Sequence, residues 1–298
     1  MRKLLKKGDS GEDVKLLQKA LKLKVDGSFG PKTEEAVKVF QGINGMVIDG
    51  IAGPKTQSAI FKEDIKKYMD TQMTVPLFET ILLDDDEYHH GPASPAYIYL
   101  HHTAGWHNPI NTIKDWNNDS RGKIATEFII GGPSIRGNDN TFDGRIIKCM
   151  PDGGYAAHLG NNGSQAMHNN SVGIEVCNFG QLTKTDAGFK TYSGALVHES
   201  QVCDLGYKWR GFQYWHKYST AQIEALKDLI LFIASRNNID VRIGLKEFLK
   251  TEDPATAFDF KKDAWSGKIK GILSHSNIRK DKTDMFPQPE LVDMLRKL

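Results

Sequence analysis

A chain of 298 residues with 39% hydrophobic and 26% charged residues has the composition of an ordinary globular protein and is long enough for two domains. Its net charge of +2 excludes the strong positive field that would draw nucleic acid to the whole surface. No apolar run approaches the ~18 residues of a membrane-spanning helix, and none follows the basic N-terminus, so we expect neither a membrane span nor a signal peptide.

The N-terminal part contains an internal repeat. The segment VDGSFGPKT at residues 25–33 returns as IDGIAGPKT at residues 48–56. Each copy predicts a tight turn at Asp-Gly, followed by a helix whose first residue is Pro. Ser10 is expected to cap an earlier helix that carries Val14 and Leu17 on one face. The pattern predicts a three-helix unit of about 60 residues, near the lower size limit for independent folding.

The doubled turn, with LLQKAL before its first copy and VFQ between the copies, resembles the peptidoglycan-binding domains of bacterial and phage cell-wall hydrolases. The resemblance covers residues 5–62 and implies that residues 1–63 form a domain that binds peptidoglycan. The turns themselves have a structural role in any case. Tethering to a polymeric substrate raises effective concentration, which is a reason to attach so small a domain to an enzyme.

Residues 64–90 differ in character from their surroundings. The segment KEDIKKYMDTQM at residues 62–73 is polar and is compatible with a further helix, and residues 79–95 are acidic and then marked by Pro and Gly. We interpret residues 64–90 as a linker and lead-in segment, in which His89 and His90 face solvent rather than bind a metal.

Residues 91–298 alternate strand-like apolar runs with amphipathic helical segments. Strands are predicted over residues 97–103, 126–132, 144–150 and 171–179, and helices over residues 109–119 and 220–238. This order predicts an α/β domain with one mixed central sheet flanked by helices.

Three cysteines, Cys149, Cys177 and Cys203, cannot all pair, and none lies in a CxxC motif. We expect reduced and buried thiols rather than a disulfide.

Candidate metal ligands stand near both ends of this second domain. His101 and His102 end the apolar run YIYL, and His275 and Asp284 lie in SHSNIRKDKTD. Two imidazoles and a carboxylate are the protein ligands of an open, catalytic Zn²⁺ site, which predicts hydrolysis rather than a structural metal. Strand side chains alternate faces, so His101 and His102 cannot both face the metal. The spacing of His275 and Asp284 is not by itself a metal signature.

Five motifs follow one another along this domain: YLHHTAG, TEFIIGG, AAHLGNNG, NSVGIEVCNFG and SHSNIRKDKTD. Together they resemble the zinc-dependent N-acetylmuramoyl-L-alanine amidases of the type-2 group over residues 96–290. The resemblance implies hydrolysis of the amide bond between N-acetylmuramic acid and L-alanine in peptidoglycan. It also implies that the Zn²⁺ cofactor is held by His101, His275 and Asp284.

The resemblance assigns roles to further residues. Glu175 matches the general base that activates water, and Lys282 matches the lysine that stabilises the developing oxyanion. Some members place a Tyr on the strand after the first ligand, where this chain has Thr126 or Glu127, which strengthens the assignment of Glu175. We expect Thr126 and His158 to contact substrate, with simple packing as the alternative for His158.

Residues 183–217 follow the Glu175 strand as a long aromatic-rich segment in which this chain departs from the family pattern. The segment either has a local core of its own or forms a wall of the groove that contacts glycan or stem peptide. Its clustered aromatic residues are Tyr207, Trp209, Phe212, Tyr214 and Trp215.

We therefore expect a monomeric peptidoglycan amidase whose partner is peptidoglycan and not nucleic acid. The expected role is a phage lysis enzyme (endolysin) that stays in the host cytoplasm until a membrane pore releases it to the cell wall. A bacterial autolysin and a recycling enzyme are alternatives, although the latter would have little need of a wall-binding domain. A non-catalytic recognition protein would lack a zinc ligand, and a muramidase would need a placed pair of carboxylates.

Overall fold

The computed structural model describes residues 4–44, 46–61, 76–91, 94–160 and 165–298. The chain divides into two compact units, one of residues 1–75 and 231–238 and one of residues 76–230 and 239–298. The polar helix considered for residues 62–73 lies outside the described residues. No helix in the described part of the chain combines the length and apolarity needed to cross a membrane.

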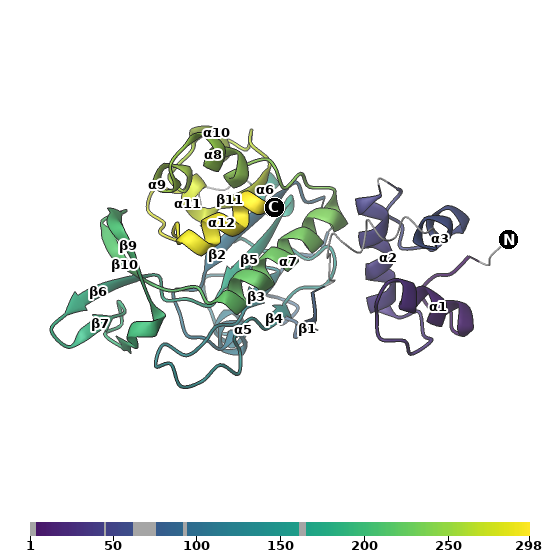
Figure 1. The fold of residues 1–298 in the computed structure, drawn as a ribbon, viewed down its shortest axis with the longest axis horizontal. Coiled ribbons are helices and arrows are strands. Elements are labelled where there is room, and N and C mark those ends of the chain that lie inside the picture. The colour runs from purple at the N-terminus through teal and green to yellow at the C-terminus, as the bar shows by residue number, and fades with distance from the viewer. Residues whose placement is uncertain (1–3, 45, 62–75, 92–93, 161–164) are drawn as a thin grey trace. The chain divides into compact units, whose positions relative to one another are not determined.

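Three helices build the first unit: α1 (Glu12–Ala20), α2 (Pro31–Ile43) and α3 (Pro54–Ile60) (Figure 1). Pro is the first residue of α2 and of α3, as the repeat predicts. The predicted cap at Ser10 is wrong, because α1 begins after Gly11 and Ser10 instead forms a bridge with Ser28.

A buried glutamine secures each copy of the repeated turn. The Gln18 side chain donates to the Asp26 carboxylate at 2.8 Å and accepts from the Gly27 amide at 2.9 Å. Gln41 makes the same two bonds, at 2.7 and 2.9 Å, with the Asp-Gly pair at residues 49–50. Both glycines have positive φ, of 75° and 70°, which glycine adopts at little cost. The repeat in sequence is therefore a repeat in hydrogen bonding.

The second unit contains a six-stranded mixed sheet in the order β1-β4-β3-β5-β2-β11. Neighbouring strands are parallel except for β3 and β4, which are antiparallel. This confirms the predicted mixed sheet. The strands are β1 (Phe78–Thr80), β2 (Tyr97–His102), β3 (Phe128–Ile130), β4 (Ile146–Lys148), β5 (Ser171–Val176) and β11 (Gly271–Ser274).

Strand β1 lies within the segment interpreted as a linker and lead-in. It pairs with β4, and Leu83 and Tyr88 after it are buried in a core cluster. Residues 76–90 are thus part of the second unit, whereas residues 64–75 lie outside the described residues.

Helices flank the sheet. In Figure 1 the long helix α7 runs across it and the C-terminal helices gather beside β11. The helices are α5 (Pro109–Asn117), α6 (Gln165–Asn169), α7 (Thr220–Asn237), α8 (Leu245–Thr251), α9 (Pro254–Ala257), α10 (Lys262–Trp265), α11 (His275–Ile278) and α12 (Pro289–Lys297). All three cysteines are buried and unpaired, as expected.

The aromatic-rich segment forms a second, five-stranded antiparallel sheet in the order β8-β7-β6-β10-β9, drawn to one side of the mixed sheet in Figure 1. Trp215 is buried and stacks on Phe286 at 4.8 Å, and Trp209 packs against it at 5.4 Å. These two rings support the interpretation as a local core. The elements are β6 (Gln181–Thr185), β7 (Gly188–Lys190), β8 (Leu196–Val197), the 3₁₀ turn Glu199–Gln201, β9 (Val202–Trp209) and β10 (Phe212–His216).

Candidate metal centre and its cleft

Two neighbouring parallel strands bring the candidate histidines together. His101 lies near the carboxyl end of β2, and His275 directly follows β11, whose Ser274 pairs with Leu100. Because parallel strands end at the same edge of a sheet, residues far apart in sequence meet there. The loop after α11 then returns Asp284 to the same place.

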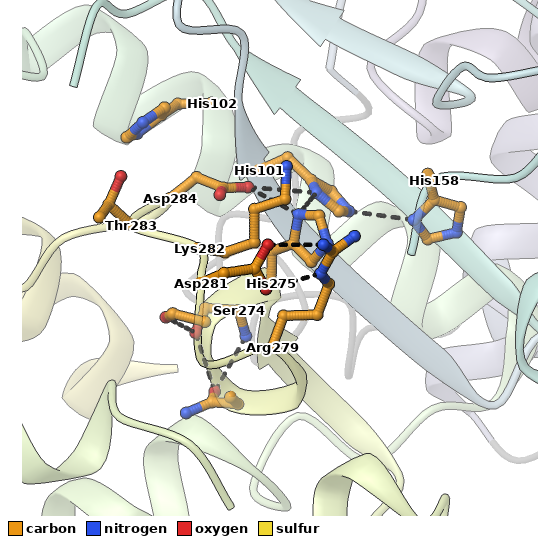
Figure 2. Close-up of polar contacts among 12 residues, drawn as sticks. His101, His102, His158, Ser274, His275, Arg279, Asp281, Lys282, Thr283 and Asp284 are labelled. Atoms are coloured by element: carbon orange, nitrogen blue, oxygen red, sulfur yellow. Dashed lines mark hydrogen bonds and ion pairs between the residues drawn. The ribbon is translucent and has the colours of Figure 1, made fainter. Parts of the chain in front are cut away.

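The three side chains converge on one point (Figure 2). His275 Nδ1 lies 3.0 Å from His101 Nδ1 and 3.0 Å from Asp284 Oδ2, and His101 Nδ1 lies 3.4 Å from Asp284 Oδ2. All three residues are buried. Ligand atoms about 2.0–2.1 Å from a tetrahedral zinc would be about 3.3 Å from one another, so these distances fit that ion.

His102 faces away from this group. Its Nδ1 lies 2.8 Å from the Tyr218 hydroxyl, and Figure 2 shows its ring apart from the converging side chains. The alternation of side chains along β2 therefore gives His101 to the candidate centre and His102 to a separate buried contact.

The protonation states suit a cation. Burial, reinforced by the nearby His275, lowers the pKa of His101 to about 4, so its imidazole is neutral at neutral pH. Burial by itself would raise the pKa of Asp284, but His275 and a hydrogen bond with His101 hold it well below its usual value. Neutral imidazole and ionised carboxylate are the forms that bind a metal.

A chain of hydrogen bonds fixes the orientation of His101. Its Nε2 lies 3.0 Å from His158 Nδ1, and His158 Nε2 lies 2.8 Å from the Ser171 hydroxyl. That hydroxyl donates to the His168 carbonyl at 3.3 Å, so it accepts from His158 Nε2. His158 Nδ1 is then the acceptor for a proton on His101 Nε2. The Nδ1 lone pair of His101 is left to face His275 and Asp284.

Glu175 stands beside the centre on β5, in register with His101 on β2. Its Oε2 atom is buried and has no hydrogen-bond partner among the described residues. Burial, followed by the charge of Asp284, raises the pKa of this carboxyl well above its usual value, against the opposing influence of Lys282. An unpartnered carboxyl with a raised pKa is typical of a group that transfers protons.

Lys282 lies in the loop that carries Asp284, and an arginine from the second sheet holds this loop. The guanidinium of Arg210, in the turn between β9 and β10, donates to the carbonyls of Arg279 at 3.1 Å and Lys280 at 3.0 Å. It also donates to the carbonyl of Lys282. The sequence analysis missed Arg210. Its Arg-Gly turn signals a hairpin, but nothing in the sequence shows which loop the hairpin contacts.

Thr126 is buried, and its hydroxyl donates to the Phe128 carbonyl at 3.0 Å. Both ring nitrogens of His158 are likewise engaged within the protein. Contact of Thr126 and His158 with substrate stays a prediction. Since their polar atoms are already hydrogen-bonded within the protein, mainly their carbon atoms remain for such a contact.

A cleft of about 1060 Å³ passes over the centre. This volume is slightly above the roughly 300–1,000 Å³ typical of small-molecule sites and leaves room for a larger ligand. All seven residues that the sequence analysis assigned to metal binding, catalysis or substrate contact line it: His101, Thr126, His158, Glu175, His275, Lys282 and Asp284.

Comparison with known families gives two matches. Residues 10–60 match a peptidoglycan binding domain, and residues 91–288 match the family described as N-acetylmuramoyl-L-alanine amidase. A comparison with curated proteins finds no match.

Solved structures add partial similarities. A fused Zn-dependent amidase/peptidase/peptidoglycan-binding protein of Clostridium acetobutylicum is 34% identical over 21% of this chain and 30% of its own, with a TM-score of 0.20. The Burkholderia AP3 phage endolysin is 45% identical over 20% of this chain and 25% of its own, also with a TM-score of 0.20. The E. coli amidase AmiD, solved with an anhydro-N-acetylmuramic acid peptide, is 14% identical over 69% and 81%, with a TM-score of 0.33. The chain thus spans less than a third of the first two proteins.

The raised pKa of Glu175 predicts that this residue destabilises the metal-free fold as pH rises. Above the pKa of about 4.3 in an unfolded chain, unfolding releases a proton that the folded state retains, so the unfolding free energy falls with pH. Glu175→Gln removes this loss. In chelator, its stability gain over the parent protein, measured by urea unfolding, should be larger at pH 8 than at pH 5. In the exposed control Glu199→Gln, the change in unfolding free energy should be the same at pH 5 and pH 8. An equal stability gain at both pH values for Glu175→Gln would contradict the prediction.

Proposed function

The chain belongs to the N-acetylmuramoyl-L-alanine amidase family, and from that premise we propose that it hydrolyses the amide bond between N-acetylmuramic acid and L-alanine in peptidoglycan, with Zn²⁺ as cofactor. One observation carries the proposal. Two imidazoles and a carboxylate converge within 3.4 Å beside the unpartnered carboxyl of Glu175, in a cleft large enough for substrate.

His101, His275 and Asp284 would hold the zinc ion. When bound there, zinc supplies Lewis acidity, which favours attack of water on a carbonyl at neutral pH. A protein that only recognises peptidoglycan has no need of this complete set beside a proton acceptor, so the site favours catalysis over recognition alone.

The chain's own groups supply the proton transfers and the charge stabilisation. Glu175 Oε2 accepts a proton from the attacking water and returns it to the leaving nitrogen of L-alanine. The Lys282 ammonium stabilises the negative charge that develops on the amide oxygen. Arg210 contributes by holding the backbone of the Lys282 loop. The cleft is complete within one chain, which supports action as a monomer.

His158 acts as a positioning residue in this proposal. By accepting the Nε2 proton of His101, it fixes the tautomer whose Nδ1 can bind a metal. Because both ring nitrogens of His158 are already hydrogen-bonded, any contact of this residue with substrate would be made by the face or the carbon edge of the ring.

We assign residues 1–63 to binding of the cell wall and residues 91–298 to catalysis, with residues 64–90 as the linker and lead-in, of which residues 76–90 pack as part of the second unit. The family match over residues 10–60 supports the first assignment. A tethered amidase remains close to its polymeric substrate between cleavages.

The combination of an amidase with a wall-binding domain suits a phage lysis enzyme, and a bacterial autolysin is the alternative. For the lysis enzyme, a culture that produces the full chain in the cytoplasm should lyse only after chloroform opens the inner membrane. The fall in culture turbidity after chloroform is added measures this lysis. Lysis that needs no permeabilisation would favour an exported autolysin.

Replacing His158 by Ala should lower zinc affinity about 10- to 100-fold, the usual effect of removing the partner of a metal-bound histidine. Competition with a chromophoric chelator measures this without any activity assay. His107→Ala, outside the cleft, serves as the control. Unchanged affinity in His158→Ala would show that the hydrogen-bond chain does not set the His101 tautomer.

Glu175→Ala should lower kcat by about 10²- to 10⁴-fold while the protein keeps its zinc, because the side chain transfers protons without binding the metal. Turnover and metal content are measured on the same preparation. Loss of zinc from this variant would instead make Glu175 a ligand or a structural support.

A digest of purified peptidoglycan tests the reaction itself. Mass spectrometry should detect free stem peptides that begin with L-alanine, beside uncleaved glycan strands. Chelator should abolish the products and zinc should restore them. New reducing sugar ends would indicate a glycosidase, and binding without cleavage would indicate a recognition protein.

A further inference from the structure

The cleft has two chemically different ends on either side of the candidate metal centre. On the His158 side the cleft is lined by Lys123, whose backbone carbonyl accepts from the Ala157 amide. Two further cations line the cleft, Arg121 and Arg279, and they pair with Asp119 and Asp281 respectively. The other end is formed by uncharged groups, including Phe179, Tyr192 and Thr283. Figure 2 shows Thr283 and His158 on opposite sides of the centre.

The substrate of the proposed reaction has a matching asymmetry. The stem peptide carries free carboxylates, whereas the glycan strand is uncharged wherever the lactyl carboxyl of N-acetylmuramic acid is tied up in the amide bond. Charge complementarity therefore places the peptide at the cationic end and the sugars at the uncharged end.

Tyr192 is largely exposed, yet its hydroxyl is held by a hydrogen bond. It lies between β7 and β8 with 66% of its surface exposed, and its hydroxyl donates to the Ala104 carbonyl at 2.8 Å. Ala104 follows the β2 strand that carries His101, and its φ of 50° is unusual for a residue other than glycine. The second sheet thus presents an ordered aromatic ring at the edge of the catalytic cleft.

Trp106 extends the aromatic surface beyond the cleft. It is 43% exposed, and its ring packs edge-on against the buried Phe179 at 5.1 Å. Tyr192 packs against the same Phe179 at 6.2 Å. Large exposed apolar side chains gathered at the mouth of a site are typical of ligand contacts.

A second hollow of about 490 Å³ continues from Trp106. Its lining includes Asn111, Ser134, Asn138 and Asp139, whose side chains offer both donors and acceptors of hydrogen bonds. Aromatic faces for the apolar side of a sugar ring, next to amides and hydroxyls for its hydroxyl and acetamido groups, form a surface suited to saccharide.

We propose that Tyr192 and Trp106 form a binding track for the glycan strand, leading from the uncharged end of the catalytic cleft into the Asn111–Asn138 hollow. This inference rests on the proposed amidase function and specifies the direction in which substrate lies. The second sheet contributes to substrate binding through Tyr192, not through the five clustered aromatic residues singled out from the sequence.

The test compares substrates that differ only in glycan length: a muramyl peptide with one sugar, and the same peptide on a chain of four or more sugars. Tyr192→Ala and Trp106→Ala in the full chain should each lower kcat/KM for the long substrate about tenfold. Trp106→Ala should change the single-sugar substrate less than twofold. Trp265→Ala removes a ring of similar exposure, 44%, and serves as the matched control with no change on either substrate.

Tyr192→Phe keeps the ring and should retain most of the activity on the long substrate. Equal losses on both substrates, or no loss, would overturn the track. A loss of kcat/KM that depends on the length of the stem peptide would place the peptide at Tyr192 and Trp106, and would also overturn the glycan track.

Binding of peptide-free glycan strands separates this inference from the proposed reaction. The two alanine variants should bind these strands more weakly than the Trp265→Ala control, whether or not any amide is cleaved. A wild-type protein that cleaves neither substrate, yet loses glycan binding in the variants, would retain the track and reject the amidase. If the wild type cleaves the substrates and the variants bind glycan as well as the control does, the amidase would be retained and the track rejected.

Discussion

The close approach of three buried polar groups at the ends of β2 and β11 is the constraint on which the rest of the site depends. Two imidazole nitrogens lie 3.0 Å apart, with a carboxylate oxygen at 3.0 and 3.4 Å, and all three residues are buried at the floor of the cleft. A buried polar group that lacks a partner destabilises the fold, so most buried lone pairs and protons are paired. The hydrogen-bond chain through His158 and Ser171 supplies the partner of His101 on one side, and a divalent cation of the proposed kind would satisfy the lone pairs that face inward.

The same constraint explains how the rest of the cleft is arranged. Glu175 sits in register with His101, so its carboxyl enters a space already poor in water, and its proton affinity rises. In the proposed reaction, substrate would lie along the cleft that both Lys123 and Tyr192 line. The mixed sheet positions His101 and Glu175, and the loops and the second sheet supply the side chains that line the rest of the cleft.

Local patterns in the sequence predicted the parts of the fold that depend on local physics. The apolar run ending at His101 and the helical spacing in residues 220–238 gave β2 and α7 nearly to the residue. The three-residue strand β1 was missed because it is too short for alternation to show and is fixed by its pairing with β4. The Ser10 cap failed because a pairing with Ser28, distant in sequence, competed with capping. The role of Arg210 depends on a contact between two segments far apart in sequence, which no local pattern contains.

The hairpin turn at Arg210 makes the second sheet a mechanical support of the candidate metal centre. One guanidinium ties together successive carbonyls of the loop that bears Lys282 and Asp284, and it also pairs with Asp259 at 2.6 Å. The second sheet projects from the mixed sheet in Figure 1 and has the outline of a removable appendage. Trimming it to obtain a smaller enzyme would release the loop that carries the candidate metal ligand Asp284. A minimal version of this protein must therefore keep the β9–β10 hairpin, or replace its arginine with another brace for that loop.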